Sequence, residues 1–110
     1  MIDWSRVEEL QSEIGAEDFA EVVELFLDEV EEVIERLRST PDISRLEEDL
    51  HFLKGSALNL GFRAFSVLCQ SGESASAVGK AASVDLGPIL DCFDSSKIEF
   101  TGKLEANRAA

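Results

Sequence analysis

The feature that most constrains the fold is a long apolar periodicity between residues 19 and 37. Apolar side chains recur there every three or four positions, with glutamates filling the outer face: Phe19, Val22, Val23, Phe26, Leu27, Val30, Val33, Ile34 and Leu37. This spacing is that of one face of an α-helix, whereas a half-buried strand would alternate every two residues. Arg36 and Arg38 follow near the end of the segment, where cations favour a helix C-terminus. Residues 16–38 are therefore predicted to form a long amphipathic helix.

The rest of the chain shows the same kind of periodicity, and no segment is typical of a strand. A short helix is expected over residues 3–14, capped by Asp3 and ended by Gly15. Further helices are predicted for residues 43–60, 63–78 and 86–106, with Gly61 ending the first of them. The predicted buried stripe of the 43–60 helix consists of Ile43, Leu46, Leu50, Leu53, Ala57 and Leu60.

Short connections between long helices favour antiparallel neighbours. The predicted fold class is all-α, an antiparallel up-and-down four-helix bundle with a short additional N-terminal helix. A chain of 110 residues is long enough for one such domain and not for two, so residues 1–110 are predicted to be a single domain. Nothing in the sequence demands more than a monomer.

The net charge of the chain limits the kinds of partner that it can bind. With 23 acidic and 10 basic residues the net charge is −13, which repels phosphate backbones and anionic lipid. Nucleic acid and membranes are therefore poor candidates. The start of the sequence resembles no secretory signal, no apolar run is long enough to span a bilayer, and Cys69 and Cys92 have no Cys-x-x-Cys spacing. We expect a cytoplasmic protein with reduced thiols.

The single histidine of the chain, His51, lies outside the predicted buried stripe. Helical geometry rotates it about 130° from the centre of that stripe, so its imidazole is expected to face solvent. Lys54 and Gly55 share its neighbourhood one turn later. A glycine in mid-helix costs about 1 kcal/mol relative to alanine and needs a reason. Close approach of another molecule beside His51 is such a reason, whereas an isolated surface histidine would be incidental.

The chemistry that fits this patch is phosphoryl transfer through histidine. A neutral imidazole can attack phosphorus through one ring nitrogen while the other is held by an acceptor, and Lys54 would offset the charge of the phosphoryl oxygens. The sequence has no GxxxxGK[ST] and no GxGxxG motif, so it offers no nucleotide-binding or kinase site of its own. The phosphoryl donor must then be another protein.

The stretch "HFLKGSALNLGF" (residues 51–62) resembles the His-x-Leu-Lys-Gly-Ser signature of histidine-containing phosphotransfer (HPt) domains, and "LCQSGE" (residues 68–73) resembles the following helix of that family. The resemblance covers roughly residues 15–105. It implies that His51 accepts a phosphoryl group, that Lys54 is its charge partner and that Gly55 leaves room for a docking receiver domain. The implied partners are response-regulator receiver domains and a hybrid sensor histidine kinase. No cofactor is implied for this chain, and Mg²⁺ only for the partner receiver domain.

The same resemblance assigns Glu73 to the position from which the family orients the imidazole. Gly72 departs from the pattern, which usually has leucine there. This departure leaves open how tightly the turn packs and how firmly Glu73 is placed.

Other interpretations of the patch compete with phosphotransfer. Glu48-x-x-His51 has the spacing of di-metal bundles, but that chemistry needs two such units and further glutamates, so no metal site is predicted. A phosphorylation-independent helical adaptor that binds a signalling partner remains an alternative function. Leu58 and Phe62 would serve partner docking in either case, although ordinary packing would explain them equally well.

Overall fold

The computed structural model describes the backbone of residues 1–109 and the side chains of residues 1–105. This part of the chain is helical apart from short connections and contains no strand, so the all-α prediction is confirmed. The elements in chain order are α1 (Trp4–Ile14), α2 (Ala16–Ser39), the short 3₁₀ helix η1 (Ile43–Arg45), α3 (Leu46–Leu60), α4 (Arg63–Ala77), a second 3₁₀ helix η2 (Ala81–Ser83) and α5 (Leu86–Ala109).

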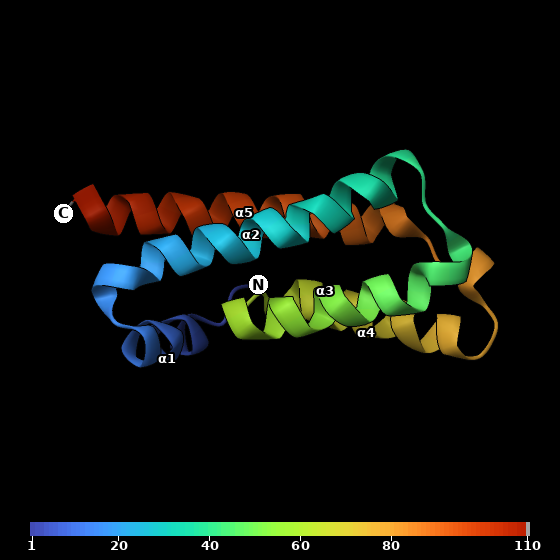
Figure 1. Ribbon diagram of the computed structural model, residues 1–110, viewed down its shortest axis with the longest axis horizontal. Coiled ribbons are helices and arrows are strands. Elements are labelled where there is room, and N and C mark those ends of the chain that lie inside the picture. The colour runs from blue at the N-terminus through green and yellow to red at the C-terminus, as the bar shows by residue number, and fades with distance from the viewer. Residues whose placement is uncertain (110) are drawn as a thin grey trace.

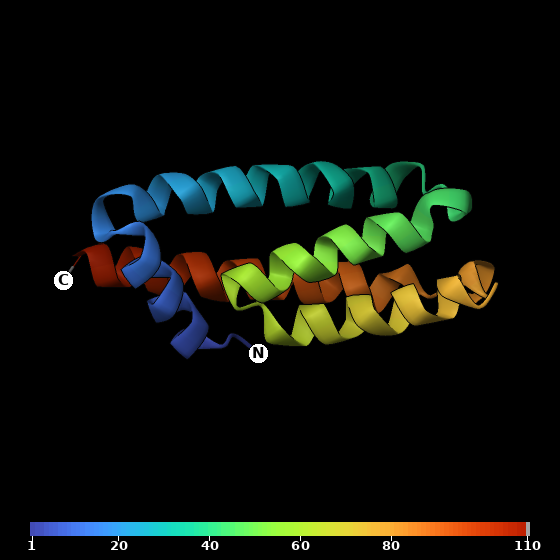
Figure 2. The same ribbon diagram turned by 60° about the horizontal axis from the view of Figure 1, so that its bottom comes forward.

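The four long helices lie along the long dimension of an elongated molecule of 47 × 23 × 21 Å (Figure 1). The chain reverses direction from each long helix to the next, as the colours show (Figure 1). Around the bundle, α2 contacts α3, α3 contacts α4, α4 contacts α5, and α5 contacts α2. The short helix α1 crosses one end of the bundle at a steep angle and packs against α2 and α3 (Figure 2). None of the helices described is both long and apolar enough to cross a membrane.

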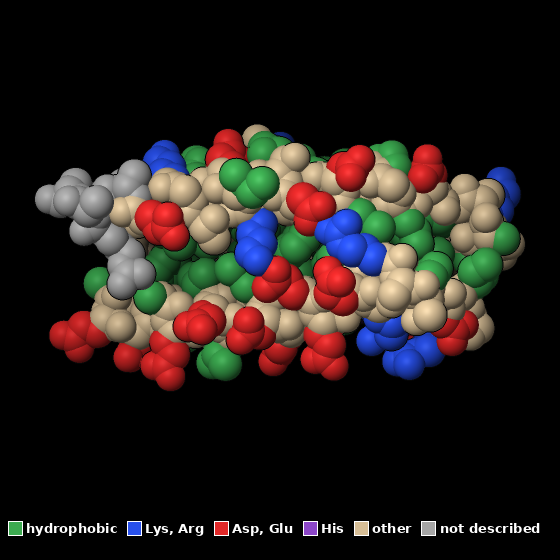
Figure 3. Space-filling model, turned by 90° about the horizontal axis from the view of Figure 1, so that it is seen from above, with side chains coloured by type: hydrophobic (Ala, Val, Ile, Leu, Met, Phe, Trp, Pro, Cys, Tyr) green, Lys and Arg blue, Asp and Glu red, His purple; other side chains and the backbone are tan. Residues whose placement is uncertain are grey.

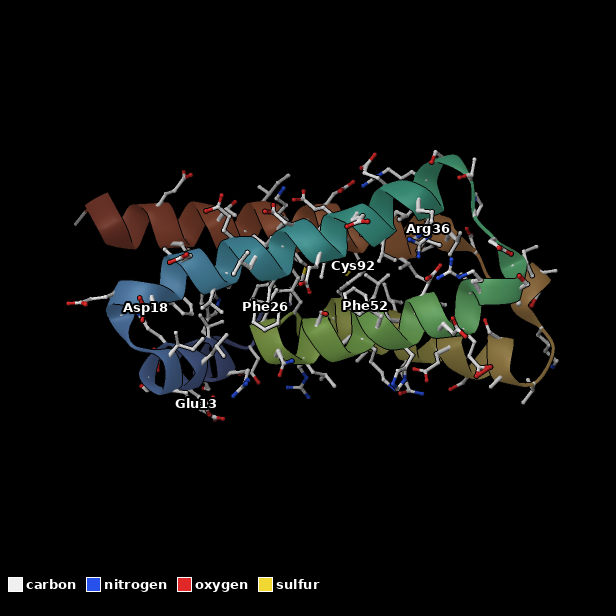
Figure 4. The ribbon with its side chains drawn as sticks, viewed as in Figure 1. Glu13, Asp18, Phe26, Arg36, Phe52 and Cys92 are labelled. Atoms are coloured by element: carbon white, nitrogen blue, oxygen red, sulfur yellow. The ribbon has the colours of Figure 1, made fainter. Side chains whose placement is uncertain are left out.

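The core is built from the apolar stripes that the periodicity predicts. The fully buried large side chains are Ile34 of α2, Leu50, Leu53 and Leu60 of α3, Phe65 and Cys69 of α4, and Phe93 and Phe100 of α5, together with Phe62. The seam between α2 and α3 is joined by an ion pair, in which Arg36 Nη2 lies 2.5 Å from Asp49 Oδ1. Phe26 of α2 and Phe52 of α3 lie along the same seam (Figure 4). The ion pair and the two aromatic side chains thus lie between α2 and α3.

Gly61 determines how the N-terminal segment joins the bundle. It ends α3 as predicted, with a φ of 82° that favours glycine. A Cβ atom added at Gly61 would lie 2.7 Å from the backbone oxygen of Asp3, and the Asp3 amide donates a hydrogen bond to the Gly61 carbonyl at 2.7 Å. Asp3 also caps α1, as predicted, by accepting a hydrogen bond from the Arg6 amide. The C-terminal end of α3 and the N-terminal end of α1 are therefore packed directly against each other.

Two predicted placements are wrong. Ile43 was expected in the buried stripe, but it is 54% exposed, because residues 43–45 form a 3₁₀ helix whose side chains do not continue the spacing of α3. Phe62 was expected to dock a partner, but only 1% of it is exposed. The left-handed turn at Gly61 directs the next residue into the core, where the Phe62 ring packs edge-on against Phe100 and tilted against Phe93. The packing interpretation of Phe62 is the correct one.

The boundaries of the remaining helices differ from prediction by one to three residues. α4 ends at Ala77 rather than at residue 78, and α5 continues to Ala109 rather than ending near residue 106. Both cysteines are free, and burial raises the pKa of the Cys69 thiol to about 12. That thiol is therefore uncharged at neutral pH and acts as a small apolar core side chain.

Candidate functional site

The predicted phosphoryl acceptor lies on the outer face of α3. His51 is flanked by Leu50 and Leu53, which are completely buried, whereas the His51 side chain itself is 69% exposed. The helix holds its imidazole at the surface because the 3.6-residue period turns His51 away while its apolar neighbours enter the core. The prediction of an exposed histidine agrees with this geometry.

The imidazole is held from the next helix. His51 Nδ1 lies 2.8 Å from Glu73 Oε2, and α3 and α4 pack side by side so that these two residues face each other. A carboxylate can only accept, so this contact selects the neutral tautomer with the proton on Nδ1. Nε2 then keeps its lone pair, which makes it the nucleophilic nitrogen of the ring.

Lys54 belongs to the same network. Its Nζ forms an ion pair with Glu73 Oε1 at 2.7 Å and donates a hydrogen bond to Gln70 Oε1 at 3.0 Å. Gln70 in turn donates from Nε2 to Ser74 Oγ at 2.9 Å. Glu73 therefore uses one oxygen for His51 and the other for Lys54. This places an imidazole, an ammonium group and a carboxylate in one connected surface cluster.

The charge of Glu73 follows from these contacts. The hydrogen bond from Lys54 is the main cause that lowers the pKa of Glu73 from its ordinary value of 4.5, and the hydrogen bond from His51 adds to it against the opposing effect of partial burial. Glu73 is thus a carboxylate at neutral pH. It accepts from Nδ1 of the imidazole in the pH range where phosphohistidine would form.

Gly72 supports this arrangement rather than disturbing it. It is buried between α3 and α4, and a Cβ atom there would lie 2.7 Å from Leu50 Cδ1 and 3.4 Å from Val84 Cγ1. Glycine therefore lets α4 approach α3 closely at the turn that carries Glu73. The doubt raised by the missing leucine is removed by the 2.8 Å contact between Glu73 and His51.

The surface beside His51 is open. Gly55 is exposed, and a Cβ atom added to it would meet nothing within 4 Å. Packing inside the chain thus gives no reason for a glycine at this position, although glycine lowers helix propensity there. Leu58, one turn further along α3, is 56% exposed.

Two residues of this surface were not predicted, Gln70 and Val67 of α4. The spacing of Gln70 and Glu73, three residues apart on one helix, could have indicated that both face α3. The pairs 51–73 and 54–70 set an antiparallel register that brings Leu58 level with the exposed Val67. An apolar strip thus continues from the polar cluster along α3 and α4.

The Hpt domain family model matches residues 21–107, which is most of the chain and includes the whole cluster. The chain belongs to the Hpt domain family. Hpt domains take part in phosphotransfer in two-component signalling and interact with receiver domains and kinases in phosphorelays. The match begins inside α2 and leaves α1 outside it. No curated protein and no solved structure matches the chain.

Among the described residues, no three His, Cys, Asp or Glu side chains of this Hpt domain come together in a way that could hold a metal ion. His51 is instead engaged with Glu73, which also binds Lys54.

Replacing Gly55 by glutamine is expected to slow phosphoryl transfer while stabilising the fold by about 0.5 kcal/mol, because glutamine is the better helix former. Gly102 of α5 offers a matched control, since it is also helical, exposed and open around its Cβ position. Gly102→Gln should stabilise similarly and leave transfer unchanged. The measurements are urea unfolding and single-turnover transfer, and equal transfer rates for both variants would remove the docking role of Gly55.

The lowered pKa of Glu73 predicts a specific pH dependence. Because the folded-state pKa lies below the ordinary value of 4.5, the stabilisation from Glu73 is fully present above that pH. It is lost as the pH falls through the lowered folded-state value. Urea midpoints of the wild type and Glu73→Gln should therefore differ most near neutral pH and converge in acid. A difference that stays constant down to the acid limit would contradict the ion pair with Lys54.

Proposed function

We propose that this Hpt domain is a phosphorelay intermediate in which His51 accepts a phosphoryl group from a receiver-domain aspartate or a hybrid kinase and passes it to another receiver domain. The observation that carries the proposal is the exposed imidazole whose Nδ1 is held by Glu73. This leaves Nε2 as the nitrogen available to an incoming phosphoryl group. The functional unit in this proposal is an antiparallel up-and-down bundle of the four long helices.

The groups of this site and of the partner receiver domain account for every bond that forms or breaks in the transfer step. The Nε2 lone pair of His51 forms the N–P bond while the P–O bond to the aspartate of the receiver domain breaks, and the aspartate leaves as a carboxylate. The imidazole gains positive character as the bond forms. Glu73, which accepts the Nδ1 proton in a hydrogen bond, offsets that charge without moving to a new position. The reverse sequence delivers the group to the next receiver.

Lys54 is proposed to offset the charge of the phosphoryl oxygens. It is now bound by Glu73 and Gln70, and its four-carbon stem lets the ammonium group turn toward Nε2 of the neighbouring ring. One charge-assisted contact of this kind contributes about 1–3 kcal/mol.

Lys54→Ala is therefore expected to slow transfer about tenfold, which corresponds to about 1.4 kcal/mol in the barrier. Gln70→Ala should have a smaller effect, because Lys54 keeps its contact with Glu73. The exposed Lys80, in the connection after α4, is the matched charge control, and Lys80→Ala should transfer at the wild-type rate. The measurement is single-turnover transfer together with the lifetime of phosphohistidine. A Lys54→Ala variant that is normal in both would assign Lys54 to docking or solubility alone.

The partners proposed for this site are response-regulator receiver domains and a hybrid sensor histidine kinase. Gly55 and Leu58 would lie under the docked receiver, with Val67 extending the apolar contact, whereas the buried Phe62 takes no part. Mg²⁺ is proposed only on the receiver domain, with no cofactor on this chain. The chain is proposed to act as a cytoplasmic monomer.

The test uses a receiver domain phosphorylated on its aspartate with labelled phosphate. Mixed with this chain it should lose label to the chain in an acid-labile, base-stable form, and a second unphosphorylated receiver domain should then remove it. A chain that binds receiver domains tightly but takes up no label from any of them would overturn the relay function. That outcome would instead support the adaptor function.

A further inference from the structure

A groove separates α2 from α5 near the end of the bundle that α1 closes. It has a volume of about 610 Å³, and Figure 3 shows the hollow between the two helices, with apolar side chains at its base. Its apolar lining residues are Ala16, Phe19, Ala20, Val23, Leu27 and Leu104. The volume falls within the range of about 300–1,000 Å³ typical of ligand pockets in proteins. This α2–α5 groove plays no part in the His51 site.

Where the groove ends, ion pairs join α2 to α5 along the rest of the bundle. Lys97 of α5 pairs with Glu31 of α2 at one end of the groove. Further along, Arg38 Nη2 of α2 lies 2.5 Å from Asp94 Oδ1 of α5. Side chains thus bridge α2 and α5 beyond the groove, whereas the groove itself is left open to solvent above an apolar floor.

The rim of the α2–α5 groove is strongly acidic. Among the side chains that the structure describes, one cation, Lys97, lies at the rim and is paired with Glu31, and five carboxylates line it: Glu17, Glu24, Asp28, Glu31 and Glu105. A chain of net charge −13 repels a second copy of itself, and such a rim repels anionic lipid and nucleic acid. Charge complementarity therefore favours a cationic occupant with apolar anchors.

We propose that the α2–α5 groove is a second interaction surface, which binds a cationic amphipathic helix of a partner protein. Apolar side chains of that helix would cover the accessible Ala16, Ala20 and Leu104, and its lysines or arginines would face the carboxylates of the rim. The open, elongated shape suits a helix laid into the groove, with anchors at helical spacing. Acidic steering would speed the encounter at low salt.

The groove lies on the side of the bundle away from the phosphotransfer site. His51 lies on α3 facing α4, whereas the groove is formed by α2 and α5, and these two pairs make opposite sides of the ring of contacts around the bundle. No histidine is visible on the face that shows the groove (Figure 3). A partner helix in the groove therefore leaves His51 free, so that one protein can hold the domain while a receiver docks.

The test is titration of the chain with an 18-residue peptide that carries leucines on one helical face and lysines on the other. The control peptide has the same composition with the leucines distributed around the helix. Calorimetry gives the affinity, and backbone amide NMR shifts locate the binding site. The amphipathic peptide should bind at least tenfold more tightly and shift amides of α2 and α5, with affinity falling as salt rises.

Two matched double variants distinguish the effect of carboxylates at the rim of the groove from the effect of the total charge of the chain. Glu24→Lys with Asp28→Lys cancels the net negative charge of the described rim, whereas Glu29→Lys with Glu32→Lys makes the same charge change elsewhere on α2. The rim variant should bind at least tenfold more weakly and the control less than threefold more weakly. Circular dichroism verifies that both variants are folded.

Equal losses in the two double variants would overturn the proposal, as would equal binding of both peptides or amide shifts confined to α3 and α4. His51→Gln should bind the peptide as the wild type does. Peptide binding tests the proposed role of the groove, whereas label transfer to His51 tests the phosphotransfer function, so either proposal can fail without the other.

Discussion

Replacing His51 by glutamine is expected to abolish phosphoryl acceptance while leaving the fold nearly unchanged. The side chain is 69% exposed and forms a hydrogen bond with Glu73, which a glutamine amide can replace by donating to the same carboxylate. Exposed substitutions of this kind usually change stability by no more than about 0.5 kcal/mol. Melting followed by circular dichroism and single-turnover labelling measure the two parts of the expectation.

The result is decisive because His51 is the only histidine of the chain. All acid-labile, base-stable phosphate must therefore disappear, rather than fall to a lower level supplied by other histidines. Glu73→Gln serves as a control, because it keeps the nucleophile and changes only the group that holds the ring. It should retain measurable transfer. A His51→Gln chain that still acquires such a phosphate would show that the acceptor lies elsewhere, and loss of the fold would make His51 a structural residue.

The helices could be predicted because their determinants are local. The spacing of α2, the stop at Gly61 and the cap at Asp3 are all properties of a few neighbouring residues, and the structure has them where the sequence indicated. Ile43 was misplaced because the same spacing fits a 3₁₀ turn and an α-helix over three residues. Phe62 was misplaced because its direction depends on the left-handed turn before it, which helical periodicity does not describe.

The site was predictable only in part, for a related reason. An exposed His51 with Lys54 and Gly55 follows from the geometry of one helix, and Glu73 came from the resemblance to a family. The role of Gln70 depends on the register between α3 and α4, which is set by tertiary packing. The groove between α2 and α5 could not be foreseen either, since amphipathic patterns say which faces are buried but not where two helices leave a hollow.

Gly72→Leu is expected to destabilise the domain by about 3 kcal/mol, near the upper end of the usual cost of overpacking. The first carbon of any side chain at this position would lie 2.7 Å from Leu50 Cδ1, with Val84 and Ile89 on the other sides. Leu50 is completely buried, so it has little room to move. The small gain in helix propensity over glycine, about 1 kcal/mol at most, cannot offset this crowding.

The same substitution should slow phosphoryl transfer. Separating α4 from α3 at Gly72 draws the neighbouring Glu73 away from Nδ1 of His51, which lies 2.8 Å from it in the wild type. Gly102→Leu is the matched control, because Gly102 is helical and has nothing within 4 Å of its Cβ position. That variant should gain slightly in stability, by less than about 1 kcal/mol, and should keep its transfer rate. Urea unfolding and single-turnover transfer are the measurements.

A double-variant cycle isolates the contact that makes Gly72 necessary. Leu50→Ala alone should cost about 2–5 kcal/mol, because it leaves a cavity in the core. Combined with Gly72→Leu, however, it makes room for the new side chain, so the double variant should be more stable than the sum of the two losses by about 1–3 kcal/mol. Transfer should recover in parallel as Glu73 returns toward His51. Strict additivity of the two losses would show that crowding against Leu50 is not what requires a glycine at this turn.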